Sequence, residues 1–186
     1  MGYDGYHLVV RDDPKSPVAE AIRTLRTNLQ YLSLDRPLKS IMVTSALPGE
    51  GKTTIASNLA VALADAGADT IVVGTDLRKP ALHKVFGKEN RIGVTSILTG
   101  HATLEEALQP TDHPRLRFLP SGPVPPNPAE MLASKAMRRL IAEVEASAEM
   151  VIFDSAPVIA VTDAALLAPA VGGTLLVVGI GQTPRD

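Results

Sequence analysis

Short apolar runs recur along the chain, and each indicates a β-strand. The run Thr70–Thr75 lacks polar alternation in its apolar part, which is typical of a strand covered on both faces of a sheet. The predicted strands are Ile41–Thr44, Thr70–Thr75, Leu116–Leu119, Met150–Phe153 and Thr174–Ile180. Because these strands alternate with helical segments, they favour right-handed crossovers and a parallel sheet. The pattern therefore predicts an α/β fold.

Helical patterns fill the segments between the strands. Ser16 is a favourable N-cap and Pro17 a favourable first residue of a helix, which we expect to continue to about Leu34. Its apolar stripe comprises Val18, Ile22, Leu25, Leu29 and Leu32. Other helices are expected over Lys52–Ala66, within 81–90, in two short pieces of 93–109, over Ala129–Ala148 with an interruption near Ser134, and from a cap at Thr162 or Asp163 to Ala168.

The length of 186 residues predicts a single domain with a real core. We expect residues 1–15 to form an N-terminal tail and residues 16–186 to form the folded domain. The net charge of −2 argues against a protein that binds nucleic acid by electrostatic attraction. The sequence contains no cysteine, which excludes disulfides and thiolate metal sites.

One uncharged stretch, Ala164–Pro184, is long enough to raise the question of a membrane span. Pro169 and the pair Gly172–Gly173 divide it into two parts. We therefore expect a short helix, a turn and a buried strand there, and not a membrane-spanning helix.

A phosphate-binding loop is indicated between the first strand and the helix that follows it. Gly49 to Thr53 form a Walker A ending, in which the glycines let backbone N–H groups point at an anion. Lys52 can reach the β- and γ-phosphates of a nucleotide, and the Thr53 hydroxyl can bind Mg²⁺. Ala46 replaces the first glycine of the strict motif. The predicted nucleotide-binding residues are Pro48, Gly49, Glu50, Gly51, Lys52, Thr53 and Thr54. The fold class is accordingly a doubly wound, mostly parallel sheet flanked by helices, of the P-loop NTPase type.

Two acidic residues follow the ends of other apolar strands. Asp154 ends the run that begins at Met150, which is typical of a Walker B acid that binds Mg²⁺. Asp76 and Arg78 follow the strand that begins at Thr70. Ligands of parallel sheets gather at the carboxyl ends of the strands, so we expect the P-loop and both acids to converge. Arg78 either neutralises phosphate charge or forms an ion pair with Asp76 or Asp154.

In four stretches the chain resembles the bacterial tyrosine autokinases of capsule and exopolysaccharide assembly. They are Glu20-x-x-Arg23-x-x-Arg26, Pro48-Gly-Glu-Gly-Lys-Thr53, Ile71-Val-Val-Gly-Thr-Asp-Leu-Arg78 and Val151-Ile-Phe-Asp-Ser-Ala-Pro157. A proline-rich segment between Leu119 and Glu130 also resembles the corresponding segment of this family. The resemblance covers roughly residues 14 to 186.

The resemblance implies transfer of the γ-phosphate of ATP, with Mg²⁺, to tyrosine. Lys52 and Asp76 are implied as catalytic residues, and Thr53, Asp76 and Asp154 as the metal shell. Glu20, Arg23 and Arg26 are implied to join subunits into a homo-oligomeric ring, although their spacing alone favours a solvated helix face with an i, i+3 ion pair. The resemblance further implies a membrane-embedded activator, or polysaccharide co-polymerase. It also implies a position at the cytoplasmic face of the plasma membrane, through that partner or a fused membrane segment.

Two departures from the family pattern affect the expected activity. The first acid of the Walker A′ strand is replaced by Gly74, which offers no carboxylate to orient a phenol or accept its proton. No tyrosine cluster ends the chain, whose tyrosines are Tyr3, Tyr6 and Tyr31. The family's C-terminal helix and tyrosine tail are therefore expected to be missing.

Three functions are consistent with these motifs. The first is a tyrosine autokinase, weakened or inactivated by Gly74. The second is an ATPase switch of the partition and septum-site type, which is disfavoured because Leu47 occupies the position of that group's second lysine. The third is a non-catalytic ring subunit that binds ATP as a structural ligand.

Overall fold

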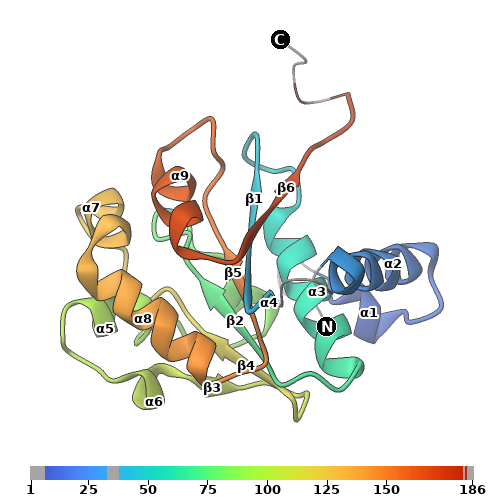
Figure 1. Ribbon diagram of the computed structural model, residues 1–186, viewed down its shortest axis with the longest axis horizontal. Helices are drawn as coiled ribbons and strands as arrows, with labels where there is room; N and C mark the ends of the chain where they lie inside the picture. The colour runs from blue at the N-terminus through green and yellow to red at the C-terminus, as the bar shows by residue number, and fades with distance from the viewer. Residues whose placement is uncertain (1–6, 33–37, 182, 184–186) are drawn as a thin grey trace.

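A computed structural model describes residues 7–32, 38–181 and 183, and its centre is a six-stranded sheet (Figure 1). The strand order is β3-β4-β2-β5-β1-β6. The strands are β1 Ser40–Ser45, β2 Thr70–Gly74, β3 Gln109–Pro110, β4 Leu116–Leu119, β5 Met150–Asp154 and β6 Gly173–Val177. All pairings are parallel except that of β3 with β4. The predicted α/β class and all five predicted strands are confirmed, and β3 is an addition. Its two residues include Pro110, which is too little for a sequence pattern to detect.

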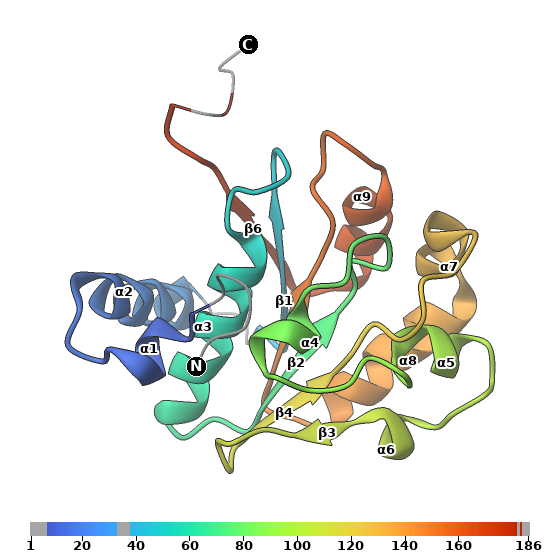
Figure 2. The same cartoon turned by 180° about the vertical axis from the view of Figure 1, so that it is seen from behind.

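Helices cover both faces of the sheet, as Figures 1 and 2 show from opposite sides. One face carries α1 Val9–Asp12, α2 Pro17–Leu32, α3 Lys52–Asp65 and α4 Leu82–Val85. The other carries α5 Val94–Leu98, α6 Leu104–Ala107, α7 Pro128–Ala133, α8 Lys135–Ala146 and α9 Asp163–Leu167. A short 3₁₀ turn, Ala168–Ala170, follows α9. The expected interruption lies at Ser134, whose side chain accepts the backbone N–H of Met137 and caps α8.

Alternation along each strand divides the core into two layers. In β5, Ile152 packs in the layer under α3, whereas Val151 and Phe153 pack in the layer under α8. In β1, Ile41 and Val43 pack in the layer under α3, whereas Met42 packs in the layer under α8. Because both faces are apolar and covered, polar side chains are expected at the strand ends, which is where the site lies.

The segment expected to be a tail is partly packed on the domain. Leu8 and Val10 are buried against α3, and Val9–Asp12 forms the short helix α1. Asn58 of α3 fixes this segment, because its side chain accepts the Val10 N–H at 3.0 Å and donates to the His7 carbonyl at 2.9 Å. The prediction of a tail over 1–15 is therefore wrong for residues 8–12, whose apolar run is too short to predict a helix.

The apolar stripe predicted for α2 is only partly buried. Ala19 and Ile22 are buried, whereas Val18 is 59% exposed and Leu32 is 77% exposed. The helix contacts α3 through a narrow strip, so the ends of the predicted stripe extend beyond the contact. The Arg26 side chain turns back toward α3, where its Nη1 donates to the Ala62 carbonyl at 3.3 Å. The predicted end of the helix near Leu34 lies outside the described residues.

The uncharged C-terminal stretch forms α9, a turn and β6, as expected from its proline and glycines. The strand was predicted to be buried, and this is wrong, because β6 lies at the sheet edge and Leu176 is 51% exposed. Thr162 precedes α9 but makes no side-chain capping hydrogen bond. Within the described ranges, no helix is both apolar enough and long enough to span a bilayer.

Candidate nucleotide-binding site

The P-loop joins β1 to α3 and has the backbone geometry that phosphate binding requires. Gly49 and Gly51 have φ angles of 87° and 89°, in the left-handed region that other residues rarely adopt. Helix α3 begins at Lys52, so its first N–H groups and its dipole point toward the loop. The sequence pattern alone predicted this strand–loop–helix arrangement, and it is confirmed.

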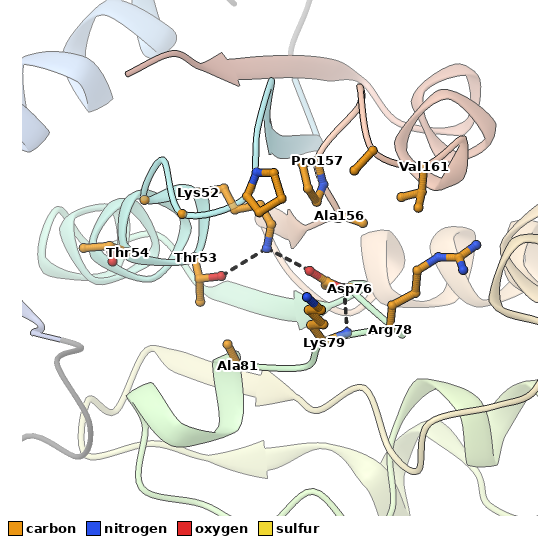
Figure 3. Close-up of a pocket in the computed structure, with 14 residues that line it drawn as sticks. Lys52, Thr53, Thr54, Asp76, Arg78, Lys79, Ala81, Ala156, Pro157 and Val161 are labelled. Atoms are coloured by element: carbon orange, nitrogen blue, oxygen red, sulfur yellow. Dashed lines mark hydrogen bonds and ion pairs between the residues drawn. The ribbon is translucent and has the colours of Figure 1, made fainter. Parts of the chain in front are cut away.

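Lys52 contacts acidic residues at the carboxyl ends of two other strands, of which Figure 3 shows Asp76. Its Nζ lies 2.9 Å from Asp76 Oδ2 and 3.8 Å from Asp154 Oδ1. The Lys52 and Asp76 side chains are only 12% and 6% exposed. The register of the parallel sheet explains this convergence, because Asp154 pairs with both Val43 and Gly74. The predicted meeting of the three strand ends is therefore confirmed.

Asp154 is the most deeply buried acid of the site. Its Oδ2 accepts the Thr53 hydroxyl at 2.8 Å, whereas Oδ1 is buried without a hydrogen-bond partner among the described residues. Burial raises the pKa of Asp154 to about 6, and Lys52 and the Thr53 hydroxyl oppose the shift. A buried carboxylate oxygen without a donor, next to the P-loop threonine, fits a hard cation with oxygen ligands.

The described residues contain no cluster of three or more acidic, histidine or cysteine side chains that could enclose a metal ion. Mg²⁺ is commonly held by one or two carboxylates together with phosphate oxygens and water, so such a cluster is not required. Thr53 and Asp154 are the residues that would hold a nucleotide-bound Mg²⁺, and the expected metal role of Asp76 stays a prediction.

A cavity of about 500 Å³ opens in front of Lys52. Six of the seven predicted nucleotide-binding residues line it, namely Pro48, Gly49, Gly51, Lys52, Thr53 and Thr54. Its other charged or apolar lining residues are Asp76, Arg78, Lys79, Ala81, Ala156, Pro157, Ala160 and Val161. One end of the cavity is thus built for phosphates and the other combines cations with a small apolar wall.

Glu50 is the predicted nucleotide-binding residue that does not line the cavity. Its Oε2 accepts the Leu47 N–H at 2.7 Å, and its Oε1 accepts the Gly179 N–H at 3.1 Å and the Thr183 hydroxyl. These donors, led by the Leu47 N–H, lower the pKa of Glu50. Glu50 therefore connects the P-loop to the segment after β6, a role that sequence spacing could not indicate.

Arg78 pairs with Asp163, a partner that the sequence pattern did not predict. Its Nε and Nη2 donate to Asp163 Oδ2 and Oδ1 at 2.8 and 2.9 Å, so the expected pairing with Asp76 or Asp154 is wrong. Asp163 is fully buried at the start of α9. The sequence marked Asp163 only as a possible helix cap, because a contact across 85 residues leaves no local signal.

Gly74 lies beside Asp154 in the sheet, where the family pattern places the first Walker A′ acid. A Cβ atom at this position would lie 2.6 Å from the Ser121 hydroxyl, which belongs to the proline-rich segment. A carboxylate at position 74 therefore requires the Ser121 side chain to rotate. Thr75, the next residue, does not line the cavity and donates its hydroxyl to the Asp154 carbonyl at 2.9 Å.

The predicted oligomer contacts lie on α2, away from the cavity lining. Glu20 and Arg23 form an ion pair of 3.3 Å, in which Glu20 is 71% exposed. Arg26 turns toward α3 and its Nε is buried without a hydrogen-bond partner among the described residues. The role of all three in assembly stays a prediction.

Comparisons with known proteins agree with this geometry. A family model described as an AAA domain matches residues 38–177. The chain is 45% identical over 180 residues to tyrosine-protein kinase YwqD of Bacillus subtilis, covering 97% of this chain and 76% of YwqD. The chain belongs to the bacterial tyrosine-protein kinases. This kinase chain is also 32% identical to the putative tyrosine-protein kinase CapB of Staphylococcus aureus, covering 92% of the chain and 75% of CapB.

Solved structures of similar sequence share the fold of this kinase chain. The chimerical protein CapA2B2 is 39% identical, with a TM-score of 0.90 over 96% of this chain and 78% of that one. The kinase domain of the Escherichia coli tyrosine kinase ETK is 32% identical, with a TM-score of 0.92 over 96% of this chain and 70% of that one. Some relatives are much longer, and the chain spans 23% of the putative tyrosine-protein kinase EpsB of Ralstonia nicotianae. The family predicted from the motifs is confirmed, and it replaces the septum-site alternative.

Proposed function

We propose that this chain transfers the γ-phosphate of MgATP to a tyrosine hydroxyl and acts in the synthesis or export of a bacterial capsule or exopolysaccharide. The observation that carries the proposal is the convergence of Lys52, Asp76 and Asp154 at one P-loop cavity. The match to YwqD over nearly the whole chain supports the same reaction.

The P-loop backbone and four side chains at the cavity have roles in this reaction. The backbone N–H groups of the P-loop and Lys52 bind and orient the phosphates, and Thr53 and Asp154 would hold Mg²⁺. When bound there, Mg²⁺ would neutralise charge on the phosphate oxygens. The phenolic oxygen forms a bond to the γ-phosphorus while the bond to the β–γ bridging oxygen breaks and ADP leaves. The phenolic proton passes to Asp76, the acidic side chain that lines the cavity.

Gly74 favours a second candidate function, that of an ATP-binding subunit with little or no transfer activity. A positioned carboxylate contributes roughly 100-fold or more to a step that removes a proton, so its absence at position 74 has a large kinetic cost. In that case the site binds MgATP and the nucleotide stabilises the fold or an assembly.

The proposed partners are other copies of the chain, through Glu20, Arg23 and Arg26, and a CapA-like membrane activator. The similarity to CapB, and to a solved chimera whose name joins CapA and CapB, supports the second partner. We place the chain at the inner face of the plasma membrane through such a partner or a fused membrane segment. No role in nucleic-acid binding is proposed, given the net charge of −2.

The test compares the unchanged chain with Gly74→Asp and Gly74→Ala. Phosphotyrosine is measured after incubation with MgATP and an activator fragment. The alanine variant places a Cβ against Ser121 without adding a carboxylate, so it controls for the steric change. Gly74→Asp combined with Ser121→Ala relieves the close approach and is measured alongside.

Phosphotyrosine in the unchanged chain, and its loss on Lys52→Ala, supports the kinase function. Signal only in the two variants with Asp at position 74 supports the ATP-binding subunit. ATP binding that is equally weak with and without Lys52→Ala would contradict both functions.

A further inference from the structure

The guanidinium group of Arg78 is fixed at one side of the nucleotide cavity. Two parallel hydrogen bonds, of 2.8 and 2.9 Å, join it to Asp163, which is fully buried. Such a bidentate contact fixes the plane of the guanidinium and leaves Nη1 to face elsewhere. In the part of the chain that the structure describes, Nη1 donates to no acceptor. The Arg78 side chain stays 40% exposed, so this donor can reach a ligand.

The charges exposed at this side of the cavity are positive. Arg78 and Lys79 are both exposed, whereas the acids Asp76 and Asp163 are buried. Asp76 Oδ1 accepts the Lys79 N–H at 2.9 Å, which fixes the backbone of the turn that carries both cations. Asp163 neutralises much of the charge of Arg78, so Lys79 supplies net charge and Arg78 supplies directed donors.

The Arg78 side chain points away from the phosphate end of the cavity. Figure 3 shows its side chain extending away from Lys52 and Asp76, toward the side of the pocket that carries Val161. Ala156, Pro157 and Val161 form an apolar wall that extends from beside Lys52 toward that side, as Figure 3 shows. A wall of this kind fits an aromatic ring, and cations at its edge fit a neighbouring carboxylate.

We propose that Arg78, positioned by Asp163, binds together with Lys79 an acidic side chain that flanks the acceptor tyrosine. Asp163 is then a positioning residue, because it acts through Arg78 and does not itself reach the peptide. The inference rests on the proposed function and adds a substrate class to it: tyrosines in acidic sequence.

The test uses the whole chain with MgADP and two short fluorescent peptides, in which a central tyrosine is flanked by glutamates or by glutamines. Fluorescence anisotropy gives the affinity for each peptide. We expect the glutamate peptide to bind about tenfold more tightly, as hydrogen bonds to a charged group predict. We expect Arg78→Ala and Lys79→Ala each to remove most of this preference, and salt to reduce it.

The positioning role of Asp163 is tested with Asp163→Asn and with the double variant Arg78→Ala/Asp163→Ala. Asp163→Asn keeps one acceptor and is expected to lower the glutamate preference while leaving the affinity for MgATP unchanged. The double variant should lose no more preference than Arg78→Ala alone. The matched control is Asp69→Asn, which removes the charge from a half-buried ion pair of 2.9 Å with Arg117, away from the cavity.

Equal affinity for the two peptides in the unchanged chain would overturn the proposal, as would an effect of these variants on MgATP affinity alone. A retained glutamate preference with no phosphotyrosine on either peptide would count against the proposed kinase activity and would leave the acidic-peptide site supported.

Discussion

Lys52 and Asp76 form an ion pair of 2.9 Å, although 24 residues and an entire helix separate them in sequence. The contact exists because β1 and β2 run parallel on either side of β5, so that their carboxyl ends lie at the same edge of the sheet. Both side chains are nearly buried, and each neutralises the other while no nucleotide is bound. A bound triphosphate competes with Asp76 for the lysine.

The variant Lys52→Ala is expected to weaken both nucleotide binding and the fold. A lost charge-assisted hydrogen bond lowers ATP affinity by roughly tenfold to 100-fold. The loss also leaves Asp76 buried without its cation, which costs about 3 kcal/mol in the free energy of unfolding without nucleotide. Isothermal titration and urea unfolding measure the two effects.

Lys135→Ala, on an exposed lysine, is the control for this prediction. The double variant Lys52→Ala/Asp76→Ala should regain part of the lost stability but none of the ATP affinity. If Lys52→Ala were as stable as the unchanged chain, this would contradict a stabilising role for the buried Lys52–Asp76 ion pair.

The stability of the nucleotide-free chain should fall as pH rises from about 4 to about 6. The pKa of Asp154 is raised by burial from 3.8 to about 6, so the folded state holds a proton that the unfolded state has already released. Above about pH 6 the buried charge costs on the order of 3 kcal/mol. Asp154→Asn is therefore expected to raise the free energy of unfolding at about pH 7.5 and to leave it unchanged near pH 4.

The same variant should lose the added stability that Mg²⁺ gives to the ATP complex, because the amide is a poorer ligand for a hard cation. Urea unfolding at the two pH values, with and without MgATP, measures both effects. A variant that is less stable than the unchanged chain at both pH values would show that Lys52 and Thr53 outweigh the burial of Asp154.

Glu50→Ala is expected to loosen the P-loop without removing a direct contact to the nucleotide. The variant deletes the acceptor of the Leu47 and Gly179 N–H groups, so hydrogen exchange at both amides should quicken. We expect MgATP affinity to fall by about threefold to tenfold, as one or two net hydrogen bonds predict.

The Leu47 and Gly179 N–H donors lower the pKa of Glu50 from its ordinary value of 4.5. The protection of these two amides from hydrogen exchange should therefore be full above pH 4.5 and should disappear as pH falls through the lowered pKa of Glu50. Glu105→Ala, on an exposed glutamate, is the control. Unchanged exchange at Leu47 and Gly179 would refute the connection between the P-loop and the segment after β6.

The three polar residues of α2 should respond differently to substitution. Glu20→Ala and Arg23→Ala remove an exposed ion pair, so each should change the unfolding free energy by less than about 0.5 kcal/mol while weakening self-association. Arg26→Ala removes packing against α3 and the bond to the Ala62 carbonyl, and should cost about 1 kcal/mol. Thermal unfolding and sedimentation velocity separate the two effects. Association that survives Glu20→Ala/Arg23→Ala intact would exclude this helix face as the interface.

Local chemistry made several features predictable from sequence. The P-loop needs glycines with positive φ next to a helix that begins with Lys52 and Thr53, and such a pattern is compact enough to identify directly. Continuous apolar runs, typical of strands covered on both faces of a sheet, predicted where the strands lie. The parallel topology then placed Asp76 and Asp154 at the same edge of the sheet. The family followed from the order of these motifs.

Contacts between distant segments were decided only by the tertiary structure. The pairing of Arg78 with Asp163, the contact of Glu50 with the segment after β6, and the burial of Leu8 depend on which surfaces pack together. Burial along α2 likewise depends on the width of its contact with α3, which hydrophobic spacing does not encode. The sequence by itself thus determined the fold class and the phosphate site, because backbone geometry and strand-end chemistry are local. The partner of each charged side chain was set by three-dimensional packing, because electrostatic and hydrogen-bond contacts depend on distance in space and not on separation along the chain.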